Sequence, residues 1–210
     1  MMQDTKLSLY NWLTFIIPNF NWWVRGRVRL LRWCGVEIGQ DVEIGARVIF
    51  RGNGKIKIGD RVKIYDEVYC LCKNGVISIG DDCTLATQVY LECSGEISVG
   101  SRTGIWQRTL VTANGNSKVI IGCDVKVAHN CSLKTTAHQV NPVGVCIGED
   151  AIFEDIVVKN GVWICAGCIV LPGITIEEQT LVAAGAVVTR NFPSHSLLAG
   201  VPAIVKKIYR

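Results

Sequence analysis

An apolar residue, usually a branched aliphatic one, recurs at every sixth position along most of this chain. Up to residue 133 the repeat comes in groups of three: Ile38, Ile44 and Phe50; Ile58, Ile64 and Cys70; Ile79, Leu85 and Leu91; Val99, Ile105 and Val111; Ile121, Val127 and Leu133. A period of six is neither the 3.6 of a helix nor the two of a strand. Such fixed-period repetition indicates a solenoid, in which each repeat buries its apolar face only by stacking on its neighbours.

The breaks in this period divide the chain into triangular turns of three hexapeptides. Extra residues fall after each third hexapeptide, at 51–56, 71–77, 92–97, 112–119 and 134–145. We expect these insertions to stack along one edge, and the longest one to hold the chemistry. Ile147 is expected to begin the next turn, and the spacing of five from Phe153 to Val158 predicts a tightened turn. The period then continues through Val158, Ile164, Val170, Ile176, Val182 and Val188.

The C-terminal stretch NGVWICAGCIVLPGITIEEQTLVAAGAVVTRNFPSHSLLAGVPAIVKKI completes a pattern that resembles the hexapeptide-repeat acyltransferases. It is most similar to the galactoside and maltose O-acetyltransferases and to the capsular or lipopolysaccharide sugar O-acetyltransferases. The resemblance implies an all-β fold, a left-handed parallel β-helix over residues 34–210 that ends in a C-terminal cap. Residues 1–33 are expected to form a short N-terminal helical segment. The resemblance also implies a homotrimer with active sites between subunits.

Composition narrows the function classes. With 49% hydrophobic and 19% charged residues, the chain is too apolar to be disordered, and a net charge of +4 does not predict nucleic-acid binding. Glycine, at 21 of 210 residues, is expected at the corners of the turns. Neither a signal peptide nor a membrane-spanning run is recognised, so a cytoplasmic location is expected.

The segment NFNWWVRGRVRLLRW at 19–33 interleaves tryptophan with arginine. This pattern is typical of a helix lying on anionic lipid, which would hold the protein at the inner face of the membrane. The alternative is a terminal helix whose tryptophans pack on the body and whose arginines are solvated. The sequence leaves both open.

The ten cysteines mostly occupy or adjoin repeat positions, as small core residues do. Cys165 and Cys168 form a C-x-x-C pair, but no second pair follows, so zinc or redox use is not expected. In a reducing cytoplasm we expect free thiols. A covalent route through Cys146 or Cys165 is conceivable, although neither has an adjacent base in sequence.

Three histidines are candidates for a general base. His195 is in a late turn and His129 lies within a repeat, where a structural role is the default. His138 lies in the longest insertion, and the segment IIGCDVKVAHNCSLKTTAH resembles the turn and loop that deliver the catalytic histidine in the sugar acetyltransferases. Imidazole titrates near neutral pH, so His138 is our predicted general base. A carbonic anhydrase of this fold would need three zinc histidines, which the chain does not supply.

The resemblance also implies a binding site for acetyl-CoA as the acyl donor, with no metal required. Trp163 matches the residue near the acetyl end, and the backbone N–H near Ala166 is expected to stabilise the oxyanion. Small residues along the pantetheine and polar residues near the nucleotide complete the set: Ala128, Ala184, Thr189, Arg190 and Lys207. Cations suit the polyanionic end of CoA.

The sequence therefore predicts an acetyl-CoA-dependent O-acetyltransferase that acts on a sugar or glycan precursor of the polysaccharide or lipopolysaccharide type. The alternatives are an N-acyltransferase of an amino sugar nucleotide and, from another class, a non-catalytic β-helical binding module. Residues 106–118, where family members hold the acceptor, have no assignable equivalents, so the acceptor stays open.

Overall fold

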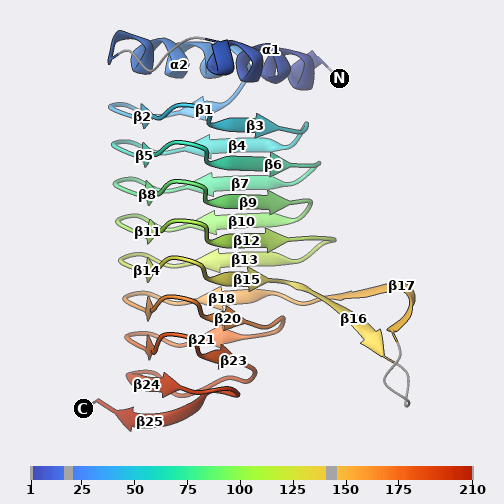
Figure 1. The fold of residues 1–210 in the computed structure, drawn as a ribbon, viewed down its shortest axis with the longest axis vertical. Coiled ribbons are helices and arrows are strands. Elements are labelled where there is room, and N and C mark those ends of the chain that lie inside the picture. Colours follow the sequence, from blue (N-terminus) through green and yellow to red (C-terminus); the bar gives the residue numbers. More distant parts are fainter. Residues whose placement is uncertain (1, 17–20, 141–145, 210) are drawn as a thin grey trace.

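The computed structural model describes residues 2–16, 21–140 and 146–209. Two helices, α1 (Met2–Ile16) and α2 (Asn21–Trp33), lie across one end of a column of short parallel strands (Figure 1). The strands form three sheets that run the length of the column, and the chain visits them in rotation. This confirms the predicted all-β parallel solenoid. Its left-handed sense stays a prediction.

Each sheet takes one strand from every turn. The first sheet contains β1 (Glu37–Ile38), β4 (Lys55–Ile58), β7 (Val76–Ile79), β10 (Glu96–Val99), β13 (Lys118–Ile121), β18 (Ile156–Val158) and β21 (Thr175–Ile176). The second contains β2 (Glu43–Ile44), β5 (Lys63–Ile64), β8 (Thr84–Leu85), β11 (Gly104–Ile105), β14 (Lys126–Val127), β19 (Trp163–Ile164), β22 (Leu181–Val182), β24 (Ser196–Ala199) and β25 (Ile204–Ile208). The third contains β3 (Ile49–Arg51), β6 (Tyr69–Cys72), β9 (Tyr90–Cys93), β12 (Leu110–Ala113), β15 (Ser132–Lys134), β20 (Ile169–Val170) and β23 (Val187–Val188).

The residues at period six form the core. Ile58 pairs with Ile79 and Val99 pairs with Ile121 across neighbouring turns, so equivalent side chains stack in vertical columns. All four are buried. Because each turn is narrow, one apolar side chain from each two-residue strand and two from a four-residue strand such as β4 fill the interior, and stacking hides them from water.

Two different constraints act on the corner residues. The first five strands of the first sheet are each followed by a glycine that close approach requires: a Cβ on Gly59 would lie 2.3 Å from Asp81 Oδ1, and one on Gly100 would lie 2.6 Å from the Gly122 carbonyl carbon. By contrast, several left-handed corners hold charged residues, as at Arg61 and Asp82, whose side chains pair at 2.7 Å. The expectation that glycine occupies the corners is therefore only partly correct.

The N-terminal helices cover the first turn. Leu7 and Tyr10 of α1 and Leu31 of α2 are fully buried against it. Asn11 Nδ2 donates to the carbonyl of Phe50 at 2.9 Å, and the Phe50 N–H donates to Asn11 Oδ1 at 3.2 Å. Asn11 thus supplies to β3 the hydrogen bonds that an additional strand would otherwise make.

The arginine and tryptophan positions differ from the expectation of packed tryptophans and solvated arginines. Arg27 is buried, and its Nη1 donates to the Ile44 carbonyl at 3.0 Å. Trp33 is exposed. The side chains of Trp22 and Trp23 lie outside the described residues. No helix within the described ranges is long and apolar enough to cross a bilayer.

The corner insertions stack along the edge between the third and first sheets, as predicted (Figure 1). The longest one is an antiparallel hairpin of β16 (Thr136–Val140) and β17 (Cys146–Phe153) that projects from the column. Ile147 and Phe153 therefore do not begin a turn, and that prediction is wrong. The spacing of five marks the return from the hairpin to β18.

Candidate functional site

The base of the hairpin is held by buried hydroxyl groups. Thr135, the residue before β16, is fully buried, and its Oγ1 accepts a hydrogen bond from the Asn114 N–H at 3.1 Å. Ser117 Oγ lies 2.7 Å from the same oxygen. On the returning arm, the Glu154 N–H donates to the Thr135 carbonyl at 3.0 Å. Both arms are thereby tied to the corner of the preceding turn.

An aromatic contact fixes the returning arm. Gly115 has φ of +61°, and a Cβ there would lie 2.8 Å from ring atoms of Phe153. The Phe153 ring therefore rests directly on the Gly115 backbone. Just beyond it, Asp155 Oδ1 accepts a hydrogen bond from the Lys118 N–H at 2.7 Å. The hairpin is anchored at its root and leaves the solenoid beyond it.

His138 lies in β16 opposite Ala151 of β17, and its side chain is exposed. The register of the hairpin shifts between His138 and Val140. His138 follows the buried Thr135 by three residues, so the anchored start of β16 determines where the backbone of His138 lies. An exposed imidazole on such an arm can accept a proton from a substrate bound beside the solenoid.

The other two histidines are part of the solenoid's own turns. His129 accepts a hydrogen bond at its carbonyl from the Gly167 N–H at 3.0 Å, and its side chain is exposed. His195 has φ of +57°, and its carbonyl accepts a hydrogen bond from the Tyr209 N–H at 2.7 Å. Both backbones serve to stack neighbouring turns.

Three of the predicted donor-site residues lie at the corner between the second and third sheets. Ala128, Ala166 and Ala184 follow β14, β19 and β22 in three consecutive turns. Ala166 and Ala184 occupy equivalent positions, and Ala128 lies one position earlier in its turn. Within the described ranges, the Ala166 N–H donates to no acceptor, whereas its carbonyl accepts from the Gly185 N–H at 2.9 Å. A free N–H beside small side chains can stabilise an oxyanion.

The remaining predicted donor-site residues are exposed. Trp163 of β19 is 52% exposed and faces outward from the second sheet. Thr189 and Arg190 follow β23 at the edge that bears the hairpin. The Arg190 guanidinium lies 5.3 Å from the Phe192 ring centroid, and Lys207 Nζ lies 4.9 Å from that of Tyr209. Neither cation forms an ion pair with a described residue, so both can meet an anion.

One copy of the chain does not bring all these residues together. The hairpin leaves from the edge between the third and first sheets, which in a three-sided column is opposite the second sheet (Figure 1). Trp163 lies on that second sheet, and Ala166 lies one full face away from the hairpin root. Six residues of strand span roughly 20 Å. His138 and Trp163 of one copy therefore lie on different sides of the column.

The cysteines have the environments of core residues. The nine whose side chains are described are free thiols, and seven of them are buried. Burial raises the pKa of Cys165, and it raises that of Cys70 to about 12. A neutral buried thiol is a poor nucleophile. The side chain of Cys146 lies outside the described residues, and no group of three or more potential metal ligands occurs among the described ones.

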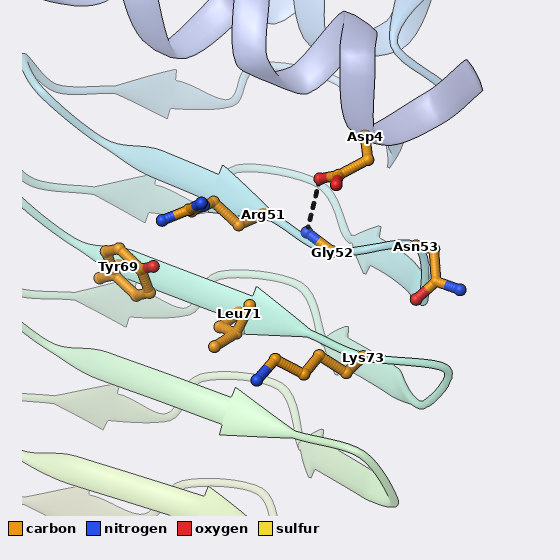
Figure 2. Close-up of a pocket in the computed structure, with 7 residues that line it drawn as sticks. All are labelled: Asp4, Arg51, Gly52, Asn53, Tyr69, Leu71 and Lys73. Atoms are coloured by element: carbon orange, nitrogen blue, oxygen red, sulfur yellow. Dashed lines mark hydrogen bonds between the residues drawn. The ribbon is translucent and has the colours of Figure 1, made fainter. Parts of the chain in front are cut away.

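A cleft that sequence analysis did not identify lies on the third sheet, next to the start of α1. Figure 2 shows two cations, Arg51 at the end of β3 and Lys73 just after β6, on either side of Leu71. Asp4 accepts a hydrogen bond from the Gly52 N–H at 3.2 Å. The cleft measures about 490 Å³. Its lining residues are Asp4, Arg51, Gly52, Asn53, Tyr69, Leu71 and Lys73. The sequence alone does not show that Arg51 and Lys73 are neighbours, because this depends on the register of β3 and β6.

The chain is similar in part to curated acetyltransferases. It is 37% identical to the galactoside O-acetyltransferase of Escherichia coli over 84 residues, which are 40% of this chain and 41% of that protein. It is 30% identical to the galactoside O-acetyltransferase of Lactococcus lactis over 105 residues, half of each chain. The matches thus span about half the length of these relatives or less. No family model matches the chain.

Two solved structures share the fold. The polysialic acid O-acetyltransferase OatWY superposes with a TM-score of 0.61 at 19% identity, covering 82% of this chain and 87% of that one. A mutant of AntD, an N-acyltransferase from Bacillus cereus in complex with an amino sugar nucleotide and coenzyme A, superposes with a TM-score of 0.59 at 17% identity. That match covers 87% of this chain and 89% of that one.

Proposed function

We propose that this chain is a hexapeptide-repeat acyltransferase and that it transfers an acetyl group from acetyl-CoA to a hydroxyl of a sugar or glycan. Its curated relatives and its fold support this proposal. The observation that carries the proposal is the exposed His138 on a rooted hairpin at the edge of the solenoid. The galactoside O-acetyltransferase relatives favour a hydroxyl acceptor over an amine.

In the proposed reaction, the neutral imidazole of His138 takes the proton from the acceptor hydroxyl. The oxygen then attacks the thioester carbonyl, and the Ala166 N–H stabilises the oxyanion of the tetrahedral intermediate. Collapse of that intermediate breaks the carbon–sulfur bond, releases CoA as thiolate and leaves the acetyl ester. The proton on His138 is returned to the thiolate or to solvent. No cysteine is needed.

We place the acyl donor along the corner that holds Ala128, Ala166 and Ala184, where short side chains leave the backbone open. Trp163 packs against the acetyl end of the donor. The exposed Lys207 of the second sheet meets the phosphates, and Arg190, which lies at the hairpin edge, meets them from the copy that supplies His138, since guanidinium and ammonium groups form charge-assisted hydrogen bonds with phosphate. Because His138 and Trp163 lie on opposite sides of one copy, the complete site forms between two copies of a homotrimer.

The acceptor has a candidate surface on the third sheet. The cleft with Arg51 and Lys73 lies on β3 and β6, and β6 is three strands from β15, where the hairpin begins. Neighbouring strands are about 4.8 Å apart, which places β6 roughly 14 Å from β15. An extended glycan with an anionic group could occupy both. The assay identifies the acceptor and decides between a hydroxyl and an amine, the acceptor type expected for an N-acyltransferase such as AntD.

The test is release of free thiol from acetyl-CoA with a panel of hexoses, amino sugars, nucleotide sugars and lipid-linked glycans. His138→Ala should lower turnover by about 100-fold or more, since it removes the general base. Cys165→Ser should leave turnover close to wild type. His195→Ala is the matched control, because it removes an exposed imidazole elsewhere on the same chain.

Loss of thiol release in His138→Ala with activity kept in His195→Ala supports the proposal. Release that depends on Cys165 instead of His138 would replace it with a covalent mechanism. No release from the wild-type protein with any acceptor would leave the binding module as the better explanation.

A further inference from the structure

The helical cap, formed by α1 and α2 at the N-terminal end of the solenoid, presents apolar side chains to solvent. In α1 the inward positions are buried, whereas Leu9, Trp12 and Phe15 are 45%, 59% and 62% exposed. Trp33 at the end of α2 is 54% exposed. The two helices lie side by side across the end of the column (Figure 1). Leu9, Trp12 and Phe15 recur every three residues, so they follow the side of α1 that faces away from the buried Leu7 and Tyr10. Exposed apolar residues grouped along one side of a helix mark interaction surfaces.

The same end of the molecule is strongly basic. Residues 2–33 contain one lysine, four arginines and a single acidic residue, Asp4. Arg25, Arg29 and Arg32 are exposed, and Lys6 Nζ lies 4.5 Å from the Trp33 ring centroid. None of these four cations forms an ion pair with a residue that the structure describes.

A cleft beside α2 gathers the three arginines. It measures about 530 Å³ and lies between α2 and the first corner of the solenoid. Its lining residues are Arg25, Val28, Arg29, Arg32, Asp41, Val42 and Glu43. Of the two carboxylates, Glu43 pairs with Lys63 at 3.8 Å. Arg32 donates hydrogen bonds to the carbonyls of Ile38 and Gly39, so the cleft offers the guanidinium groups of Arg25 and Arg29 to a ligand.

These observations favour one occupant. A second copy docked head to head would set arginines against arginines, which like-charge repulsion opposes. A nucleic acid would leave Trp12 and Phe15 without an apolar partner. The interface of an anionic membrane accepts both, because aromatic and aliphatic groups enter the headgroup boundary while arginines meet the phosphates.

We propose that the outward face of the helical cap, formed by Leu9, Trp12, Phe15, Trp33 and the adjoining Arg25 and Arg29, binds the surface of a membrane that contains anionic lipid. The solenoid then stands with its N-terminal end on the bilayer. β15 is four strands from β3, about 19 Å at the usual spacing, and the helix layer adds roughly 10 Å. The His138 hairpin is then about 30 Å above the surface, a consequence that rests on the proposed function, whereas lipid binding does not.

The test is co-sedimentation of the full chain with vesicles of phosphatidylcholine alone and with vesicles that also contain phosphatidylglycerol. We expect binding to the anionic vesicles that weakens as salt is raised. The variants Trp12→Glu/Phe15→Glu and Arg25→Glu/Arg29→Glu should each bind at least about tenfold more weakly. Ile208→Glu is the matched control, since Ile208 is an equally exposed apolar residue at the opposite end of the solenoid.

Thermal unfolding of every variant, followed by circular dichroism, checks that the fold is retained. Sedimentation velocity without lipid tests the other possible occupant of this face, a second copy of the chain. The proposal is overturned if the wild-type protein stays in solution with anionic vesicles, or if Ile208→Glu loses as much binding as Trp12→Glu/Phe15→Glu. It is also overturned if the cap variants change the oligomeric state while their vesicle binding is unchanged, because the face would then join copies of the chain.

Discussion

Gly115 is the residue on which the root of the hairpin rests. Because a Cβ at this position would lie 2.8 Å from the Phe153 ring, Gly115→Ala must displace that ring and with it the returning arm. A misplacement of about 1 Å can cost up to about 100-fold in rate. We expect turnover in the thiol-release assay to fall about 10- to 100-fold, while the solenoid loses roughly 1 kcal/mol of stability.

The control for this variant is Gly200→Ala. Gly200 also has a positive φ, at +102°, but its nearest neighbouring atom would lie 3.4 Å from the new Cβ. It therefore introduces at least as much backbone strain without moving the hairpin. Equal losses of turnover in the two variants would show that strain alone, and not the position of Phe153, explains the effect.

At the scale of single residues, the repeat predicted the buried interior accurately, but it failed where an apolar residue lies in the hairpin instead of the core. Ile147 and Phe153 are six apart, as core residues are, but both lie in the returning arm of the hairpin. A period alone cannot distinguish a turn of solenoid from a strand that pairs with its own insertion. The resemblance predicted His138 as the base; the structure adds its exposure and the rooted strand that holds it.

At the scale of elements, the cap protects the first strand of the third sheet. The side chain of Asn11 makes two hydrogen bonds with the backbone of Phe50, and both atoms of that backbone are otherwise at the open end of the ladder. Asn11→Ala should lower the free energy of unfolding by about 1–3 kcal/mol, since it leaves a partly buried N–H and carbonyl without these partners. Denaturant titration measures this loss.

Ser8→Ala on the same helix is the matched control, because Ser8 is exposed and its hydroxyl bonds only within α1, to the Asp4 carbonyl. It should change the free energy of unfolding by less than about 0.5 kcal/mol. If Asn11→Ala were equally neutral, the helices would not protect the end of the ladder through Asn11.

The orientation of α2 could not be predicted from its pattern. Arg27 shares the inward stripe with Val28 and Leu31, and its guanidinium meets the Ile44 carbonyl at the end of the second sheet. An apolar residue would leave that carbonyl without this donor. Composition alone favours an exposed arginine and a buried tryptophan, whereas the open end of a ladder requires a donor.

At the scale of the whole molecule, the three-sided column separates residues that are close together in the sequence. His138 and Trp163 are only 25 positions apart, yet they lie on opposite sides of the prism. A repeat pattern identifies which residues point outward. It does not show whether they act in a site of their own copy or of a neighbouring copy. A trimer whose axis runs along the solenoids would bring these sides together and would also set three helical caps in one plane, where they would bind a membrane with avidity.

Mixed assemblies test whether the site is shared between copies. His138→Ala keeps the proposed donor surface, and Trp163→Ala/Ala166→Asp keeps the histidine, so each variant alone should be inactive. When the two are co-expressed, an interface is productive if an intact histidine faces an intact donor surface. Random assembly gives about one productive interface in four, so thiol release should recover to about a quarter of wild type. If both groups acted within one chain, co-expression would restore nothing, because every copy would lack one of them.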